Sequence, residues 1–392
     1  MNILFVTTFQ VSEQIGGTER TTDLIANALR RKGHKCYNLY AKHIDDSFLP
    51  TSSFDRTFFY SGGKKVKKVV RDYAVSYILF EGTFTIVKPI IAASKEIGGN
   101  TRYAFVHHFS PGNEHLFNTF QGLSRTLLHA ASSKARLISL IKLLSYPFFK
   151  PAMDRRLRSL YKEVYDLCDK VVLLSDSYIE VFCRYGNIVG REKFCVIPNA
   201  LSFQETYSSD EISHKSKQVL IVTRFDETQK RISLALKIWK MVEDDPLLDE
   251  WQLKIVGHGD WGQDYRRLAH KLALRRVSFE GRQDSMPYYR QSSIYMMTSL
   301  YEGWPMVLNE AMQFGCVPIL FDTVLLPELT ANGVNSIIVP DGDTHKYYQR
   351  MRNLMVDGRR RQDMAEKVLS TSKKFTLDII SKRWEELLVS GT

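Results

Sequence analysis

A pattern of short apolar strands alternating with helical segments occurs twice in this chain, and it restricts the fold more than any other feature. Before residue 202, strands are predicted at NILFVTT, CYNLY, VSYILF, RYAFVHH, KVVLLS and EKFCVIPNA. After residue 217, they are predicted at QVLIVTRF, WQLKIVG, RVSFEG, SIYMMTS and CVPILFD. Such apolar strands are typical of parallel sheets that are buried on both faces. We therefore predict an α/β protein with two doubly wound, Rossmann-like domains that face each other across an interdomain cleft.

The polar segment SFQETYSSDEISHKSK divides the two halves, because it lacks the aliphatic periodicity of a helix or strand. We predict an N-terminal domain over residues 1–201, a linker over 202–217 and a C-terminal domain over 218–374. A final amphipathic helix is predicted within residues 375–392, and its expected packing partner is the N-terminal domain. The length of 392 residues is sufficient for two hydrophobic cores.

The net charge of +11 favours acidic partners, among which nucleic acid, anionic lipid and phosphorylated small molecules all qualify. No apolar run approaches the roughly 18 residues that a membrane span needs, and the apolar N-terminus is interpreted as a first strand. The five cysteines show no metal-ligand spacing, which indicates reduced structural thiols and a cytoplasmic location. These cysteines are Cys36, Cys168, Cys183, Cys195 and Cys316.

Ligands of doubly wound sheets bind at the carboxyl ends of the strands, so the residues that follow each strand are the candidates for a site. After the first strand, Gly16 and Gly17 allow close approach of a ligand to the backbone. A helix with Thr18 as its predicted N-cap and Gly33 as its stop begins there, and its N-terminus favours an anion. The alternative is an ordinary pair of loop glycines, since no GxGxxG motif is present.

Two cations follow the strand QVLIVT in the second half. Arg224 is placed where the strand ends and Lys230 where the next helix begins. Such a pair suits a diphosphate, because arginine binds in a fork and lysine acts as a point charge. The alternative is a solvated basic turn. The glycine-bearing turns GHGDWG and GRQDSM follow two further strands, and their backbone could hold a flat base.

Two glutamates flank the Gly-Trp-Pro turn in SLYEGWPMVLNEAMQFGCVPIL. Pro305 suits the first position of a helix, whose N-terminus would present N–H groups above the sheet. Glu310 lies about one turn inside that helix, where its carboxylate can accept two hydrogen bonds from a vicinal diol such as a ribose. Glu302 would then face the far end of the ligand. The alternative is a surface loop glutamate at Glu302 and a helix-face acid at Glu310.

The segment EGWPMVLNEAMQFGCVP resembles the E-x7-E signature of retaining glycosyltransferases with the GT-B fold, specifically the glycosyltransferase family 4-like group. The segments GGTER, GHKC, VHH, VIPNA, TRFDETQKR and VGHG extend the resemblance over most of the chain in the same order. Residues 110–165 are not covered. The resemblance implies a metal-independent hexosyltransferase that moves a sugar from a nucleotide diphosphate sugar, by family frequency a UDP-sugar, to a hydroxyl. It needs no cofactor, since the nucleotide sugar is a substrate.

The resemblance also implies residue roles. The loop of Gly16 and Gly17 would face the donor diphosphate, and Arg224 and Lys230 would bind it. Glu310 would hold the ribose hydroxyls and Glu302 the transferred sugar. Backbone amide groups would contact the phosphate and the sugar of the nucleotide sugar. They would be those of Gly303, Trp304, Pro305, Met306 and Val307, of which Pro305 has no N–H.

His107 matches a position of the family that is often near the reacting face of the sugar. Its neighbour His108 is an open alternative, and a structural role for His107 is a third. Two segments depart from the family pattern. Arg231 stands where the family often has glycine, and TVLLPELTANGVNS lacks the usual glycines before its Pro-Glu pair. The segment PDGD at residues 340–343 looks like a metal-binding DxD motif, but we interpret it as a turn and predict no metal site.

Residues 123–162 are strongly basic, because their only acidic residue is Asp154. One interpretation is a helix pair with solvated cations, a second is contact with an anionic membrane surface, and a third is contact with an acidic soluble acceptor. The second would place the enzyme at the inner face of a bacterial membrane, with a saccharide or lipid-linked saccharide of a surface polysaccharide or glycolipid as its acceptor. The nine cations are Arg125, Lys134, Arg136, Lys142, Lys150, Arg155, Arg156, Arg158 and Lys162.

Other functions remain open alternatives. A GT-B epimerase or phosphorylase shares the fold, although a phosphorylase needs a cofactor lysine for which the sequence shows no specific candidate. A non-catalytic protein that binds nucleotide sugars or nucleic acid is a different class. The chain lacks a stacking-aromatic RNA motif, so we predict no nucleic-acid partner.

Overall fold

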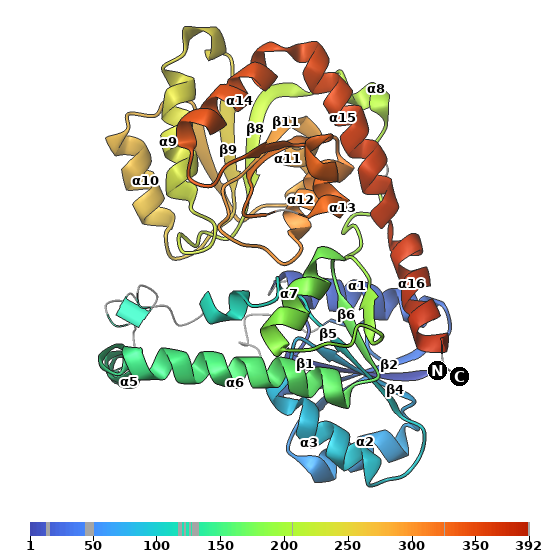
Figure 1. Ribbon diagram of the computed structural model, residues 1–392. Coiled ribbons are helices and arrows are strands. Elements are labelled where there is room, and N and C mark those ends of the chain that lie inside the picture. Colours follow the sequence, from blue (N-terminus) through green and yellow to red (C-terminus); the bar gives the residue numbers. More distant parts are fainter. Residues whose placement is uncertain are drawn as a thin grey trace. The chain divides into compact units, whose positions relative to one another are not determined.

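The structure is a computed structural model that describes residues 1–12, 16–43, 51–116, 120, 123–124, 127, 133–205, 207–324 and 326–390. It consists of two compact units (Figure 1). Unit 1 contains Met1–Pro198 and Ile380–Thr392, and unit 2 contains Asn199–Ile379.

The described strands of unit 1 form one parallel sheet in the order β3-β2-β1-β4-β5-β6-β7. The central strands are almost completely buried, as their apolar sequences predict. β3 was not predicted, because its four residues RTFF at the sheet edge are largely exposed and show no periodicity. The strands are β1 Asn2–Phe9, β2 Lys35–Lys42, β3 Arg56–Phe59, β4 Tyr77–Glu81, β5 Arg102–Val106, β6 Lys170–Leu173 and β7 Phe194–Val196.

Helices cover both faces of this sheet, with α1 on one face and α2 and α3 on the other (Figure 1). The first helix begins at Gly17 after Gly16, so the prediction of Thr18 as its N-cap is wrong. The described helices are α1 Gly17–Arg31, α2 Gly63–Asp72, α3 Phe84–Lys95, η1 Asn113–Leu116, α5 Ser133–Leu144, α6 Tyr146–Leu167 and α7 Ser177–Gly186.

The last helix, α16 (Leu377–Val389), belongs to unit 1 from Ile380 onward. Glu385 on this helix forms an ion pair with Lys32 at the end of α1. Just beyond the helix, the carbonyl oxygen of Ser390 accepts a hydrogen bond of 3.1 Å from the Arg102 guanidinium. The C-terminal segment therefore returns to the unit that contains the N-terminus (Figure 1).

Unit 2 contains a second parallel sheet, whose described strands have the order β10-β9-β8-β11-β12-β13. All strands predicted for this half are present. The short edge strand β13 was expected only as an unspecified strand before the PDGD turn. The strands are β8 Ser216–Val222, β9 Gln252–Val256, β10 Val277–Gly281, β11 Ser292–Met297, β12 Val317–Phe321 and β13 Ile337–Val339.

Helices also flank the second sheet on both sides (Figure 1). The described helices of unit 2 are α8 Ser209–Ile212, α9 Ile232–Glu243, α10 Gly262–Lys271, α11 Met286–Gln291, α12 Met306–Gln313, α13 Pro327–Thr330, α14 Thr344–Val356 and α15 Gly358–Ser372. Three short 3-10 helices complete the unit, namely η2 Pro246–Leu248, η3 Ala331–Gly333 and η4 Lys373–Phe375.

The segment predicted as a linker, residues 202–217, is held against unit 2. It contains α8 and the first residues of β8. The side-chain amide of Gln313 on α12 donates hydrogen bonds to the carbonyl oxygens of Phe203 and Glu205, at 2.8 and 2.7 Å. The polarity of the segment predicted a linker but did not predict that its backbone is hydrogen-bonded to the neighbouring helix.

Both sheets confirm the doubly wound α/β prediction. In each, the strand order changes direction once, between β1 and β4 in unit 1 and between β8 and β11 in unit 2. Loops leave the two central strands of such a switch point on opposite faces, which opens a crevice at their carboxyl ends. Among the described residues, no helix combines the length and the apolar character needed to cross a membrane.

Candidate functional site

In unit 2, the loops that follow β8 and β11 meet at the switch point of the sheet. The backbone N–H of Leu300 donates a hydrogen bond of 2.7 Å to the carbonyl oxygen of Gln229. The Gln229 side-chain amide returns one of 3.1 Å to the carbonyl oxygen of Tyr301. These bonds hold the basic loop after β8 against the Glu-Gly-Trp-Pro loop after β11.

The two loops pair Lys230 with Glu302. The ammonium nitrogen lies 2.5 Å from Oε1 of the carboxylate, and the side chains are only 14% and 8% exposed. Oε2 of Glu302 lies 3.4 Å from the Gln229 amide. The sequence predicted both residues as donor contacts but did not predict this pair. Each charge is neutralised by the other, so neither is buried alone.

Arg224 lies at the same loop with a different environment. Its side chain is 66% exposed. Nη2 makes long contacts with Asp226 Oδ2 at 3.4 Å and with Gln229 Oε1 at 3.3 Å. The guanidinium therefore remains accessible, and weak contacts of this length leave it able to turn toward an anion.

Glu310 lies on α12 and is only 1% exposed. Its Oε1 accepts a hydrogen bond of 2.6 Å from Ser202, and its Oε2 accepts one of 3.0 Å from the Tyr289 hydroxyl. Two neutral donors thus orient a buried carboxylate. Each carboxylate oxygen has a second lone pair, so the group can accept further hydrogen bonds from a diol.

The start of α12 differs from the prediction, because Pro305 is the N-cap and not the first helical residue. Its φ of −71° and ψ of 95° are extended, and the helix begins at Met306. Just before it, Trp304 is buried with its indole N–H bonded to none of the residues that the structure describes. A buried donor without a partner is uncommon, and a bound ligand could supply its acceptor.

Arg231, where the family often has glycine, has a backbone φ of +50°. Glycine adopts this region without strain, which explains the family preference. The Arg231 side chain donates to the carbonyl oxygens of Thr298 and Ser299, at 2.9 and 3.2 Å, and lies 2.6 Å from Asp341. It therefore connects three strand-end loops, a structural role that the sequence did not predict.

The ion pair of Arg231 also involves the PDGD segment, residues 340–343. As predicted, it forms a turn that follows a strand, here β13. Asp341 pairs with Arg231, and Asp343 caps α14 by accepting a hydrogen bond of 2.8 Å from the backbone N–H of Lys346. Within the described ranges, no group of His, Cys, Asp and Glu has the arrangement of a metal site.

The glycines of the GHGDWG turn allow β9 to contact the loop after β8. A Cβ on Gly257 would lie 1.8 Å from the carbonyl oxygen of Thr223, and one on Gly259 would lie 2.5 Å from that of Phe225. The backbone N–H of Phe225 donates a hydrogen bond of 2.8 Å to the carbonyl oxygen of His258. This close backbone contact supports the loop that carries Arg224 and Lys230.

In unit 1, Gly16 and Gly17 follow β1 at the start of α1, where they were predicted. A Cβ on Gly16 would lie 3.0 Å from Oε2 of Glu19, so the position is crowded by its own helix. Residues 13–15 of the same loop lie outside the described residues. The proposed contact of this loop with a diphosphate stays a prediction.

His107 is fully buried, and both of its ring nitrogens have acceptors. Nδ1 lies 2.8 Å from the carbonyl oxygen of Phe109, and Nε2 lies 2.7 Å from Glu114 Oε1. The Tyr161 hydroxyl donates to Oε2 of the same carboxylate at 2.6 Å. Burial acts to raise the pKa of Glu114, but its interactions with His107 and Tyr161 outweigh burial and hold that pKa below the ordinary value. These contacts favour the structural role for His107.

Of the two histidines, His108 is the one with a ring nitrogen open to a ligand. Its Nε2 lies 2.6 Å from Oε2 of Glu81 at the end of β4, while Nδ1 has no partner among the described residues. The hydroxyl of Thr83, two residues beyond Glu81, is likewise buried without a described partner. Glu81 and Thr83 were not predicted, although their position directly after the strand VSYILF was a signal for them.

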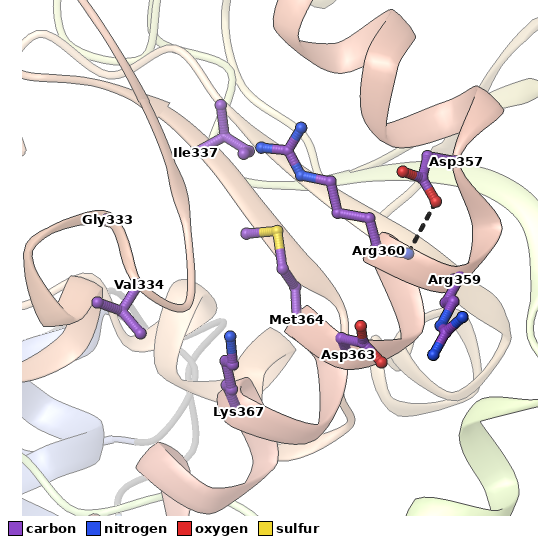
Figure 2. A pocket seen from close by; sticks show the side chains of 9 residues that line it. All are labelled: Gly333, Val334, Ile337, Asp357, Arg359, Arg360, Asp363, Met364 and Lys367. Carbon is purple, nitrogen blue, oxygen red and sulfur yellow. Dashed lines mark hydrogen bonds between the residues drawn. The ribbon is translucent and has the colours of Figure 1, made fainter.

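A separate hollow of about 400 Å³ lies on unit 2 (Figure 2). The backbone N–H of Arg360 donates a hydrogen bond of 2.9 Å to Asp357, which caps α15 there. Both acidic and basic side chains line the hollow, and none of the predicted site residues is among its described lining. That lining consists of Gly333, Val334, Ile337, Asp357, Arg359, Arg360, Asp363, Met364 and Lys367.

Comparison with known proteins gives three findings of sequence similarity. Residues 203–370 match the family model described as glycosyl transferases group 1. An uncharacterized glycosyltransferase of Haemophilus influenzae is 25% identical over 384 residues, which cover 95% of this chain and 96% of the relative. The amylovoran biosynthesis glycosyltransferase AmsD of Erwinia amylovora is 28% identical over 246 residues, which cover 59% of this chain and 65% of the relative.

Among solved structures, Anabaena Alr3699/HepE in complex with UDP is similar over the whole length of both chains. The TM-score is 0.72 and the sequence identity 18%. This likeness, at low identity, establishes the fold.

Proposed function

We propose a specific reaction for this chain, which is a glycosyltransferase of the GT-B fold whose residues 203–370 belong to the glycosyl transferases group 1 family. The reaction is the transfer of a sugar from a UDP-sugar to a hydroxyl group with retention of anomeric configuration and without a metal ion. The observation that carries the proposal is the cluster at the switch point of unit 2, where Lys230, Glu302 and the exposed Arg224 occupy the carboxyl ends of β8 and β11.

The bond that breaks joins the anomeric carbon of the sugar to an oxygen of the diphosphate. Negative charge grows on the leaving diphosphate, and in this proposal Lys230 and Arg224 stabilise it. The acceptor oxygen forms the new bond to the anomeric carbon, and its proton passes to the leaving phosphate oxygen. This route needs no protein base. It therefore agrees with a cluster in which the buried carboxylate Glu302 is already paired with a lysine.

In the proposed complex, the diphosphate competes for Lys230, which allows Glu302 to accept a hydrogen bond from a sugar hydroxyl. Glu310, held by Ser202 and Tyr289, accepts hydrogen bonds from the ribose diol. The indole N–H of Trp304 supplies a donor to the phosphates or the sugar, together with backbone amides of Gly303 to Val307. The UDP complex of a protein with the same fold supports uridine as the base.

The proposed acceptor is a saccharide or lipid-linked saccharide of a bacterial surface polysaccharide. The similarity to AmsD, named for amylovoran biosynthesis, supports this class. A lipid-linked acceptor would require the enzyme to work at the inner face of the cell membrane.

The reaction is tested by incubating the purified chain with UDP-, GDP- and ADP-sugars and measuring the release of nucleoside diphosphate, first without an acceptor and then with saccharide acceptors. We expect the highest rate with a UDP-sugar and no loss of rate in EDTA, because the charge on the diphosphate is met by side chains. Nuclear magnetic resonance of the product should show the anomeric configuration of the donor. An inverted product, or activity that EDTA abolishes and magnesium restores, would refute the proposed mechanism.

The two adjacent histidines have different expected roles, with His108 binding a sugar hydroxyl at the edge of unit 1. His108→Gln keeps an amide donor for Glu81 but removes the Nδ1 acceptor. We expect kcat/KM to fall about five- to a hundredfold, because a buried sugar hydroxyl left without its acceptor costs roughly 1–3 kcal/mol, with little change in melting temperature. His107→Gln should instead lower the melting temperature, because it disturbs the buried contacts with Glu114 and Phe109. The opposite pattern would assign the sugar contact to His107.

A further inference from the structure

The helix α5 exposes its aliphatic face. Leu137, Leu140, Ile141 and Leu144 recur at the three- and four-residue spacing of one helical stripe, and all four are exposed. Ser139, which projects from the other side of the helix, is buried. A helix of a globular protein normally buries its apolar stripe and exposes its polar side chains. In α5 the apolar stripe is exposed instead.

The apolar stripe continues at the start of the next helix. Phe148, in the first turn of α6, is 82% exposed, and Leu144 at the end of α5 is 77% exposed. Only Ser145 separates the two helices. Its carbonyl oxygen accepts a hydrogen bond of 3.0 Å from the backbone N–H of Phe148. Figure 1 shows α5 and α6 meeting at this point. We name these five side chains, from Leu137 to Phe148, the α5–α6 apolar surface.

Cations flank the α5–α6 apolar surface. Arg136 is exposed one turn before Leu140, and Lys142 lies 5.4 Å from the centre of the Phe149 ring. Farther along α6, Arg155 and Arg156 are exposed. The only acid of residues 123–162, Asp154, is paired with Lys150 at 2.8 Å. Of the nine cations named above, Arg125 lies outside the described residues.

We propose that the α5–α6 apolar surface docks on an anionic lipid bilayer. In this arrangement its leucine, isoleucine and phenylalanine side chains enter the headgroup region while the arginines bind lipid phosphates. Exposed apolar groups of this kind mark interaction sites, and basic residues beside an apolar helix face are the combination that interfacial helices use. The proposal concerns unit 1 alone and does not depend on the sugar-transfer reaction.

Charge and apolar exposure together favour a bilayer over two other occupants. In a symmetric dimer built on this surface, the basic flanks of the two copies would be brought close together, which is repulsive. An acidic saccharide would satisfy the cations but would leave Leu144 and Phe148 in water. A bilayer of anionic lipid accommodates both kinds of side chain.

The test is co-sedimentation of the full chain with phosphatidylcholine vesicles, with and without phosphatidylglycerol. We expect binding only with phosphatidylglycerol and a decrease with added salt. The double variant Arg136→Glu/Arg156→Glu should bind at least about thirtyfold more weakly, because each cation contributes roughly a fivefold factor near an anionic surface. Leu144→Ser/Phe148→Ser should bind about tenfold more weakly, because less apolar surface leaves water.

Matched controls change the same properties elsewhere. Arg359→Glu/Arg360→Glu alters the net charge equally at the hollow of Figure 2, and Val189→Ser/Leu247→Ser removes two exposed apolar side chains from other surfaces. Both controls should bind vesicles as the parent does, and all variants should bind UDP equally. The proposal is overturned if the parent ignores phosphatidylglycerol at low salt, or if the controls weaken binding as much as the surface variants. It is also overturned if the surface variants abolish a dimer and leave vesicle binding intact.

Discussion

Replacement of Lys230 by methionine is expected to lower kcat/KM by about 10²–10³-fold, the usual effect of removing one charged or donor group that stabilises a developing anion. Methionine has a similar length and volume, so the change removes little except the ammonium group. Lys230 is largely buried beside the switch point of unit 2, where water screens its charge only weakly. The rate is measured as UDP release with saturating acceptor, and the affinity for UDP by calorimetry.

The variant has a second consequence, because Lys230 is also the partner of Glu302. A buried carboxylate that loses its cation costs about 3–5 kcal/mol, so Lys230→Met alone should also unfold more easily. The double variant Lys230→Met/Glu302→Gln removes both charges. We expect it to recover most of the lost stability but none of the lost activity.

These two measurements separate the roles of the lysine. If the double variant regained activity, Lys230 would serve only to neutralise Glu302, and the assignment of Lys230 to the diphosphate would be contradicted. The single variant Glu302→Gln completes the double-mutant cycle. It frees the Lys230 ammonium, so UDP binding should be retained while transfer of the sugar is slowed.

The main strands could be predicted from the sequence because parallel strands buried on both faces have continuous apolar sequences. β4, with the sequence YILFE, is fully buried and was found in this way. β3 has the sequence RTFF, and three of its four residues are exposed. An edge strand this short is stabilised by its neighbour β2 and not by a pattern of its own, so the sequence could not reveal it.

The candidate site was predictable in position but not in its pairings. Strand ends identified Arg224, Lys230 and Glu302, since the geometry of parallel sheets brings those ends to one edge. The contact between Lys230 and Glu302 joins residues 72 positions apart and depends on how two loops fold. No local pattern encodes such a contact.

The two histidines show the same limit. His107 and His108 follow the same strand, and adjacent residues there point in different directions. Their roles are decided by Glu114 and Tyr161 on one side and by Glu81 on the other. Tyr161 lies 54 residues from His107 and Glu81 lies 27 residues from His108, while Glu114 is seven residues from His107 in the separate helix η1. No local pattern encodes these contacts, so the sequence left the choice between the histidines open.

Substitution of Gly257 by alanine is expected to have the largest effect on stability. The new Cβ would lie 1.8 Å from the carbonyl oxygen of Thr223, a backbone atom that cannot move without displacing the loop after β8. The φ of +141° at Gly257 is also a region that alanine rarely adopts. A loss of more than about 4 kcal/mol is expected, which belongs to the severe class of single substitutions.

Gly281→Ala is the matched control for this change. Gly281 ends β10, the neighbour of β9, and its φ of +74° is also positive. Apart from its neighbours in the chain, however, no atom of the described residues lies within 4 Å of the added Cβ. Only the backbone preference is then lost, about 1–2 kcal/mol. For a unit of this size, the melting temperature should fall by at least about 8–16 °C for Gly257→Ala and by about 2–8 °C for Gly281→Ala. UDP binding should be lost in the first variant and kept in the second, because the added Cβ displaces the loop of Arg224 and Lys230 only in the first. Equal shifts in the two variants would show that conformational strain, and not the contact with Thr223, requires glycine at residue 257.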